Sequence, residues 1–272
     1  KNGGIYRLPS GYNILTYAAN PELLSDNKPE TVLRASEQGG EELYPFAFNL
    51  DYSSQMAARC AIDYVDAAQG TCNFQCESFY AQLALLRRQK AALDTLPENL
   101  DVADIRDGLL YYYVILSADS IVYQPGRYLY PELKQYVYYA YPSDQDGGCQ
   151  LEFGSLLFIN SQSEQKAGAW AFLSYLLSSA YQQSVNYLPV SDTVLQEQFA
   201  QLLAEETVTQ EDIDTFYTLV DHAQKLDYPT EPIEQIIEEE MAAYLDGAID
   251  EKTTAERIQS RAGLYLMEQK VE

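Results

Sequence analysis

The sequence of 272 residues predicts a helix-rich α/β fold. Apolar residues recur at the spacing of an amphipathic helix after residue 163 and again over residues 233–245. The run of tyrosine and valine over residues 136–141 has instead the composition of a strand. A chain of this length can build one large domain or two lobes.

The first third of the chain carries signals for strands and then for helices. Apolar residues within 5–18 predict a short strand, a turn and a second strand. Helical spacing predicts a helix over 53–68, which we expect Gly70 to end, and a second helix over 77–93.

The middle of the chain is expected to supply further strands. The continuous apolar run over 109–116 predicts a buried strand or a short helix. Residues 136–141 predict a strand that Pro142 ends. Residues 151–160 predict another strand, which Gly154 relaxes in the middle.

Helices are expected to dominate after residue 160. The first follows Ser161 or Ser163, with a serine as its cap. Its apolar stripe of Trp170, Leu173 and Leu177 is expected in the core. The remaining predicted helices lie near 193–205, near 210–225, from Ile233 to Gly247 with Thr230 as the cap, and after a cap at Thr253 or Thr254.

The formal net charge of −24 comes from 41 acidic and 17 basic residues. Such a surface repels phosphate, so we expect no nucleic-acid partner. It keeps a protein dispersed, and steering of a cationic ligand is the second interpretation. The sequence lacks the run of about 18 apolar residues that crosses a bilayer. Its first four residues lack the apolar core of a signal peptide, so we expect a processed or truncated piece.

Metal and cofactor sites are not predicted. The only histidine is His222, and the four cysteines form no paired Cys-x-x-Cys motif, which disfavours zinc. We expect free, buried thiols, and the alternative is one disulfide, for which Cys72 and Cys76 are spaced closely enough if they share a helical turn.

Catalysis is poorly supported by the residue types present. A hydrolytic triad needs a base, and His222 stands alone beside Asp221 and Lys225. No nucleophile elbow, P-loop or dinucleotide fingerprint occurs. Asp144 and Asp146 remain the pair to test for glycoside hydrolysis or for calcium. We therefore expect a protein that is not an enzyme.

Two C-terminal stretches carry a family resemblance. One runs from Ser161 to Ser178 and on to Leu188-Pro189-Val190, and the other runs from Pro232 to Leu266. In their residues and in their order along the chain, they resemble the C-terminal part of the extracellular solute-binding proteins of ABC importers, the family of maltose-binding protein. The resemblance implies a type II periplasmic-binding-protein-like architecture, here as the second lobe plus a returning segment of the first lobe.

The resemblance also implies how the chain divides between lobes. The implied segments are a crossing from lobe one over 1–14, lobe two over 15–150, a returning lobe-one segment over 151–190, and lobe two with hinge-packing helices over 191–272. Because most of lobe one is missing from such a piece, we expect an exposed apolar surface along 151–180 that could pair with another chain.

The implied function is extracellular capture of a sugar or oligosaccharide for the permease of an ABC transporter. The family's full-length precursors in Gram-positive bacteria are lipid-anchored at the cell surface, and the same is expected here. Tyrosine covers the apolar face of a sugar ring, while Asn, Asp and Glu satisfy its hydroxyls. Positions near the crossings and helix ends make the following ligand-binding candidates: Tyr12, Asn13, Tyr112, Tyr141, Asp144, Tyr187, Glu231 and Glu234.

An alternative interpretation comes from another class of protein. The chain would then be an acidic, mostly helical cell-surface module that binds protein and no small molecule. A filled helical core without a cleft would favour the module.

Overall fold

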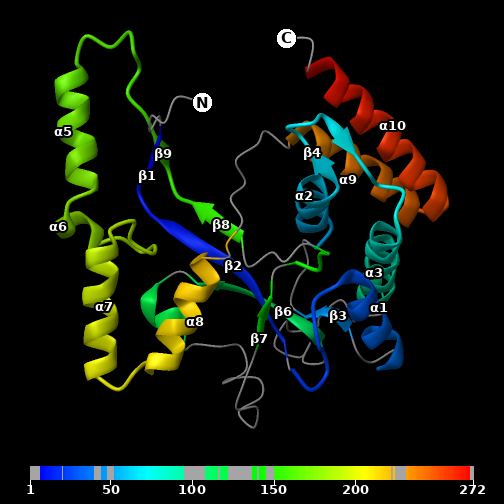
Figure 1. Ribbon diagram of the computed structural model, residues 1–272, viewed down its shortest axis with the longest axis horizontal. Coiled ribbons are helices and arrows are strands. Elements are labelled where there is room, and N and C mark those ends of the chain that lie inside the picture. The colour runs from blue at the N-terminus through cyan, green and yellow to red at the C-terminus, as the bar shows by residue number, and fades with distance from the viewer. Residues whose placement is uncertain are drawn as a thin grey trace. The chain divides into compact units, whose positions relative to one another are not determined.

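The computed structural model describes residues 7–19, 21–39, 44–47, 52–94, 108–115, 117–121, 137–139, 141–144, 150–221, 223 and 231–269. The largest sheet is built around β2 (Tyr12–Ala19), in the order β3-β6-β2-β7 with β8 also on β2 (Figure 1). Most of β2 is buried, as expected of an apolar strand with both faces covered.

Strand β2 pairs with different partners along its length. Its first half is antiparallel to β8 (Gln150–Phe153), and its second half is antiparallel to β7 (Val137–Tyr139). On the other side of the sheet, β3 (Tyr44–Ala47) runs parallel to β6 (Gly108–Ile115).

The chain divides into two compact units. Unit 1 consists of Lys1–Thr16, Tyr113–Tyr128 and Gly148–Lys225, and unit 2 of Tyr17–Tyr112, Leu129–Gly147 and Leu226–Glu272. Strand β2 therefore begins in unit 1 and ends in unit 2.

In unit 1, the helices α7 (Asp192–Ala204) and α8 (Gln210–Asp221) both pack on the 3-10 helix η2 (Ala118–Ile121). Phe199 and Phe216 join the two helices, with their rings edge to face at 5.0 Å. Thr209 and Asp212 form a reciprocal capping box, which explains why α8 begins where it does.

The other elements of unit 1 are short. Strand β1 (Leu8–Pro9) pairs antiparallel with β9 (Leu156–Leu157), and α5 (Lys166–Leu176) is followed directly by α6 (Ser179–Gln182). The predicted strand over 151–160 is thus split in two, because β8 pairs with β2 whereas β9 pairs with β1.

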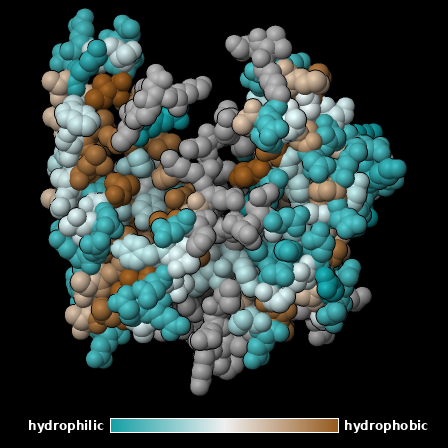
Figure 2. Space-filling model, viewed as in Figure 1, coloured by the Kyte–Doolittle hydropathy of each residue, from teal (hydrophilic) through white to brown (hydrophobic). Residues whose placement is uncertain are grey.

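Helix α5 differs from its prediction in two respects. Its first residue follows Gln165, which makes no side-chain cap, and Ser163 Oγ instead accepts a bond from the Gln165 amide at 3.1 Å. Leu173 is buried as predicted, but Trp170 is 57% exposed, so its assignment to the core was wrong. Apolar atoms accordingly lie at the surface along α5, brown in Figure 2.

Unit 2 has a helical core. Helix α2 (Tyr52–Asp63) packs on α9 (Glu231–Leu245), α1 (Pro29–Gln38) on α3 (Glu77–Asp94), and α10 (Glu251–Gln269) on α9. The predicted apolar faces supply this core, whose largest fully buried members include Tyr244, Phe46, Phe74, Phe79, Met56 and Leu86.

Of two helices predicted in unit 2, one is confirmed and the other is shorter than predicted. The helix predicted over 77–93 is confirmed as α3. The helix predicted over 53–68 ends at Asp63, because the chain then enters a hairpin of β4 (Val65–Asp66) and β5 (Thr71–Cys72). Gly70, with φ of 60°, lies between these strands rather than at the end of the helix.

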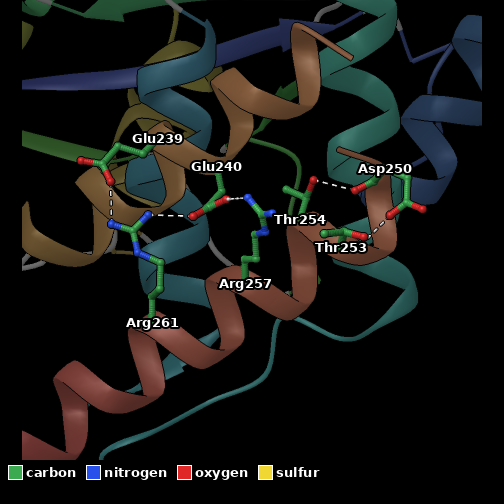
Figure 3. Close-up of polar contacts among 7 residues, drawn as sticks. All are labelled: Glu239, Glu240, Asp250, Thr253, Thr254, Arg257 and Arg261. Atoms are coloured by element: carbon green, nitrogen blue, oxygen red, sulfur yellow. Dashed lines mark hydrogen bonds and ion pairs between the residues drawn. The ribbon is translucent and has the colours of Figure 1, made fainter. Parts of the chain in front are cut away.

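Charged side chains tie α9 to α10 (Figure 3). Arg261 donates to Glu240 at 2.8 Å and to Glu239 at 2.5 Å, and Arg257 lies 3.5 Å from Glu240. The basic residues of α10 thereby neutralise two of the acidic residues on α9, the charge run that the sequence alone presents as a solvated face.

The residue that caps α10 lies three positions before the first of the two expected threonines. Asp250 Oδ1 accepts a bond from the Thr253 amide at 2.7 Å, so Asp250 caps the helix and the assignment to Thr253 or Thr254 was wrong (Figure 3). The bonds from Thr253 hold the pKa of Asp250 below its usual range. Thr254 Oγ1 donates back to the Asp250 carbonyl at 2.8 Å.

The units group some segments differently from the predicted lobes. Residues 191–225 belong to unit 1, whereas the prediction placed all of 191–272 in lobe two. The physical reason is the packing of α7 and α8 on η2, which also draws residues 113–128 into unit 1.

Two glycine replacements are expected to shift stability in opposite directions. Gly247→Ala should lower the free energy of unfolding by about 1 kcal/mol, because Gly247 has φ of +73° and an L side chain is strained there. Gly168→Ala in α5 should raise it by about 0.5–1 kcal/mol through helix propensity. A Cβ at either position meets open space. Urea titration measures both, and midpoints that move the same way would contradict the assignment.

Membrane-spanning helices are not found within the described ranges, where every helix is too short or too polar to cross a bilayer.

Candidate functional site

Three chain segments that lie far apart in the sequence meet in unit 1. Tyr12 and Leu188 exchange two backbone hydrogen bonds, of 3.0 Å and 2.9 Å. On the other side of the same strand, Asn13 lies opposite Glu152 in the β2–β8 register. We call the surface around Asn13, Glu152 and Tyr187 the crossing-strand face.

A glycine makes this convergence possible. A Cβ on Gly11 would lie 2.8 Å from Tyr187 Cβ and 3.2 Å from the Leu188 carbonyl oxygen. Real Cβ atoms essentially never approach another atom so closely, so only glycine allows the backbone of residue 187 to pass beside β2. The amide of Gly154 also donates to the Gly11 carbonyl at 2.9 Å, which brings the end of β8 to the same point.

A buried side-chain amide also joins these segments through hydrogen bonds. Gln182 is fully buried, and its Nε2 donates to the carbonyls of Ser10 at 2.9 Å and Leu176 at 2.8 Å. Its Oε1 accepts from the Val190 amide at 2.8 Å. One side chain therefore satisfies three backbone groups, which fixes the position of Tyr187 relative to Tyr12.

Asn13 gives the crossing-strand face an unusual polar group. It is 7% exposed, and its Nδ2 donates to Glu152 Oε2 at 3.2 Å. Its Oδ1 is buried and has no hydrogen-bond partner among the described residues. Buried oxygens are normally paired, so this inaccessible, unpaired acceptor is an unusual feature of the face.

The exposed groups around Asn13 complement a polyhydroxylated ring. Tyr187 is 44% exposed and offers a flat apolar face, and the exposed carboxylate of Glu152 offers acceptors. Tyr12 is half-buried, and the alternation of side chains along β2 directs it to the opposite face of the strand from Asn13. Aromatic surface next to hydroxyl acceptors is the chemistry that sugar recognition requires.

The remaining candidates belong to unit 2. Tyr141 lies in the core there, stacked on Phe46 at 5.2 Å and edge to face with Tyr17 at 5.7 Å. Burial raises the pKa of Tyr141 well above its usual value. The structure therefore places this side chain inside unit 2 rather than on an open surface.

Asp144 is exposed, and its neighbour Ser143 is held by a buried ion pair. Arg59 and Asp63 meet at 2.9 Å with side chains 4% and 3% exposed, and Arg59 Nη2 donates to Ser143 Oγ at 2.9 Å. Gln82 also donates to the Pro142 carbonyl. The loop that carries Asp144 is thus fixed by α2 and α3.

Glu231 and Glu234 lie in the first turn of α9, exposed and half-buried respectively. The backbone of Tyr112 lies in β6, but its side chain is outside the described residues. Asp146, Cys149, His222 and Thr230 also lie outside them. The crossing-strand face therefore unites two of the eight candidates, Asn13 and Tyr187, and Tyr12 joins the same segments through its backbone bonds to Leu188.

Metal ligands and thiol chemistry do not gather at this face. Within the described residues, no cluster of three or more His, Cys, Asp or Glu side chains could hold a metal ion. Cys60, Cys72 and Cys76 are free thiols, of which Cys60 is buried. Burial raises the pKa of each of the three, which keeps them in the unreactive protonated form at neutral pH.

Two residues of the site were missed by sequence reasoning. Glu152 follows the strand signal of 151–160 with no motif of its own, and Gln182 is one of many polar residues. No local signal marks either residue, because their partners lie 139 and 172 residues away along the chain.

Comparison with known proteins was made by sequence and by structure. No protein-family model matches the sequence, and no curated protein does. Among solved structures, the sugar-binding protein MalE from Xanthomonas citri is 14% identical with a TM-score of 0.61, over 99% of this chain and 73% of that protein. This chain has a maltose-binding-protein-like fold.

Two further solved structures agree with this assignment. The GacH receptor of Streptomyces glaucescens, solved in complex with acarbose, is 16% identical with a TM-score of 0.55, over 96% of this chain and 71% of its own. UgpB from Mycobacterium tuberculosis, solved with glycerophosphocholine, is 13% identical with a TM-score of 0.58, over 100% and 73%. The predicted fold class, helix-rich α/β of the periplasmic-binding-protein type, is confirmed.

Proposed function

We propose that this chain captures a sugar or oligosaccharide outside the cell for an ABC importer, and that it is a binding protein rather than an enzyme. The observation that carries the proposal is the convergence of β2, β8 and residue 187 around the unpaired Asn13 oxygen. Solved proteins of the same fold, such as the MalE protein of Xanthomonas citri, are sugar-binding proteins, which supports the choice of ligand.

The proposals on the transport partner and on the cellular location rest on the same resemblance. The partner that receives the solute would be the transporter permease, and the full-length precursor would be lipid-anchored at the cell surface. The chain covers 71–74% of the length of these solved neighbours, and its division into lobe two with a returning part of lobe one remains a proposal. Tyr112, Asp144, Glu231 and Glu234 remain proposed ligand contacts, whereas Tyr141 is packed in the core of unit 2.

A thermal-shift screen of maltose, maltotriose and other sugars, with amino acids and short peptides for comparison, tests the proposal. Binding to the folded state alone raises stability by RT ln(1 + [L]/Kd), so the melting temperature should rise with sugar concentration. Unchanged melting temperatures at saturating concentrations of every sugar, or a rise with peptides only, would contradict it.

The same assay locates the site. Tyr187→Ala should weaken sugar binding on the order of tenfold, because truncation of a central aromatic contact costs about 1–2 kcal/mol. Tyr175→Ala is the matched control, since Tyr175 is also an exposed tyrosine of unit 1, at 58% against 44% for Tyr187, and lies on α5. Equal affinities of the two variants would place the site elsewhere.

One observation supports a second candidate function. The exposed aromatic side chains of α5 fit a cell-surface module that binds protein. This alternative predicts no stabilisation by any small molecule, so the sugar screen separates the two.

A further inference from the structure

In unit 2, the segment of residues 141–144 is held by hydrogen bonds although it belongs to no helix or strand. Its first three residues are buried and the fourth is exposed. The fully buried Gln82 donates to the Pro142 carbonyl, and the Ser143 amide donates to the Asn27 carbonyl at 3.0 Å. These bonds fix the backbone of the segment up to its exposed residue.

A buried ion pair supplies a further bond to this segment. Arg59 Nη2 donates to Ser143 Oγ at 2.9 Å, and Asp63 balances the Arg59 charge at the same distance, with the two acid and base side chains 3% and 4% exposed. Replacing a buried ion pair with apolar side chains of similar size often leaves stability unchanged or raises it, because both charges lose their hydration on burial. What the pair adds, and an apolar pair would lack, is a fixed donor to Ser143.

Asp144 is the group that the held segment presents to solvent. Burial is the main cause that raises the pKa of Asp63, and the negative charge of Asp144 adds to it. The pKa of the Cys76 thiol is likewise raised mainly by burial and also by Asp144. The Asp144 carboxylate therefore lies near the end of α2 and the start of α3. An acceptor that is held in place before binding loses less conformational freedom when it binds.

We propose that Arg59 is a positioning residue of the solute site. It acts through the Ser143 hydroxyl to hold the Asp144 carboxylate where this group accepts a hydrogen bond from the solute. Arg59 itself does not reach the solute, because its side chain is buried. An ionised carboxylate only accepts hydrogen bonds, so the solute group that it receives is a hydroxyl or an ammonium. The inference rests on the proposed function, in which Asp144 is a ligand contact.

Sugar affinity and stability, measured on the same variants, separate positioning from support of the fold. Arg59→Met with Asp63→Leu removes both charges and keeps apolar bulk, so it should lower the free energy of unfolding much less than Arg59→Ala does. Loss of the donor to Ser143 should nevertheless raise the Kd about three- to tenfold. The probe is maltotriose, or the screened sugar that stabilises the parent chain most, and calorimetric titration measures its Kd. Lys90→Met with Asp94→Leu, the surface pair of the same spacing on α3, is the matched control and should leave the Kd unchanged.

Two further variants test whether Arg59 acts through Asp144. In an Asp144→Ala background, Arg59→Met with Asp63→Leu should weaken sugar binding no further, because the group that the pair positions is gone. Ser143→Ala keeps both charges and removes only the hydroxyl, and it should raise the Kd by a similar factor. If the double variant does not fold by circular dichroism, Ser143→Ala decides alone.

Three outcomes would overturn the inference. An unchanged Kd in the folded double variant means that the buried pair only supports the fold. An equal further loss of affinity in the Asp144→Ala background means that the pair acts on some other contact. Both of these results leave sugar capture by the chain in place. A parent chain that binds no screened sugar contradicts the proposed function itself, and the inference fails with it.

Discussion

Arg59→Ala is expected to lower the free energy of unfolding by about 3–5 kcal/mol, the largest effect of any single replacement considered in unit 2. Arg59 and Asp63 are one turn apart on α2, joined at 2.9 Å by Nε to Oδ2 and by Nη2 to Oδ1. Without Arg59 the Asp63 carboxylate stays buried with no cation beside it. Guanidinium chloride denaturation measures the change.

The pH dependence of this effect has a definite sign. Burial is the main cause that raises the pKa of Asp63, and it outweighs the lowering by Arg59 and Ser143. The folded state therefore holds the Asp63 proton more tightly than the unfolded state does, so this group stabilises the fold at low pH. That contribution is lost as pH rises from about 4, the ordinary carboxyl pKa, through the raised value. Arg59→Ala raises the pKa of Asp63 further, and its cost should be smaller at about pH 4 than at pH 7.

Two further variants separate burial from charge. Lys90 and Asp94 have the same spacing on α3 but lie at the surface, with side chains 43% and 60% exposed. Lys90→Ala should cost less than about 1 kcal/mol. The double replacement Arg59→Met, Asp63→Leu removes both buried charges and should cost much less than Arg59→Ala alone. A double variant as unstable as the single one would show that the ion pair itself stabilises the fold.

The helical core of unit 2 could be predicted from the sequence because its signals are local. In α3, α9 and α10 the apolar residues recur over four or more turns, so periodicity alone identifies the buried face. Shorter signals were ambiguous. Gly70 suits both the end of a helix and the turn of a hairpin, and only the pairing of β4 with β5 decides between them.

Trp170 illustrates a different limit. Its spacing with Leu173 predicts a shared buried face, but burial needs a partner element, and the described residues supply one only for Leu173 and Leu176. Periodicity predicts which side chains are able to be buried, and tertiary contacts determine which of them are.

Some residues of the candidate site could be predicted from the sequence and others could not, for the same reason. Tyr12, Asn13 and Tyr187 were predicted because crossings were assigned to their segments. Glu152 and Gln182 were not, since their partners lie 139 and 172 residues away along the chain. Contacts at such separation depend on strand register, which a single sequence does not fix.

Glutamine amides that are buried or half-buried recur as bridges between distant backbone segments in this fold. Gln89 accepts from the Phe46 amide at 3.1 Å and donates to the Phe46 carbonyl at 2.8 Å, as a neighbouring strand would. Gln259 does the same for the Phe74 amide and the Cys72 carbonyl, at 2.7 Å and 2.8 Å. Gln182 is the member of this group that supports the crossing-strand face.

Gln182→Leu should therefore lower the free energy of unfolding by about 2–4 kcal/mol. Leucine has similar volume but leaves the Ser10 and Leu176 carbonyls and the Val190 amide without their partner. Gln183→Leu is the matched control, because this next glutamine is exposed and reaches only Glu197, at 3.2 Å. It should change stability by less than about 0.5 kcal/mol.

The Gln182 variant also links stability to the proposed site. Loss of the bridge removes the link between Ser10 and Val190 that helps to position Tyr187, so sugar binding should weaken even at temperatures where the variant remains folded. Gln182→Glu distinguishes shape from hydrogen bonding, since glutamate has the same length but cannot donate to the two carbonyls when it is ionised. We expect it to be at least as damaging as leucine near neutral pH, because it also buries a charge. Wild-type stability in Gln182→Glu would mean that water replaces the bridge, and the crossing segments would then be held by the two Tyr12–Leu188 bonds alone.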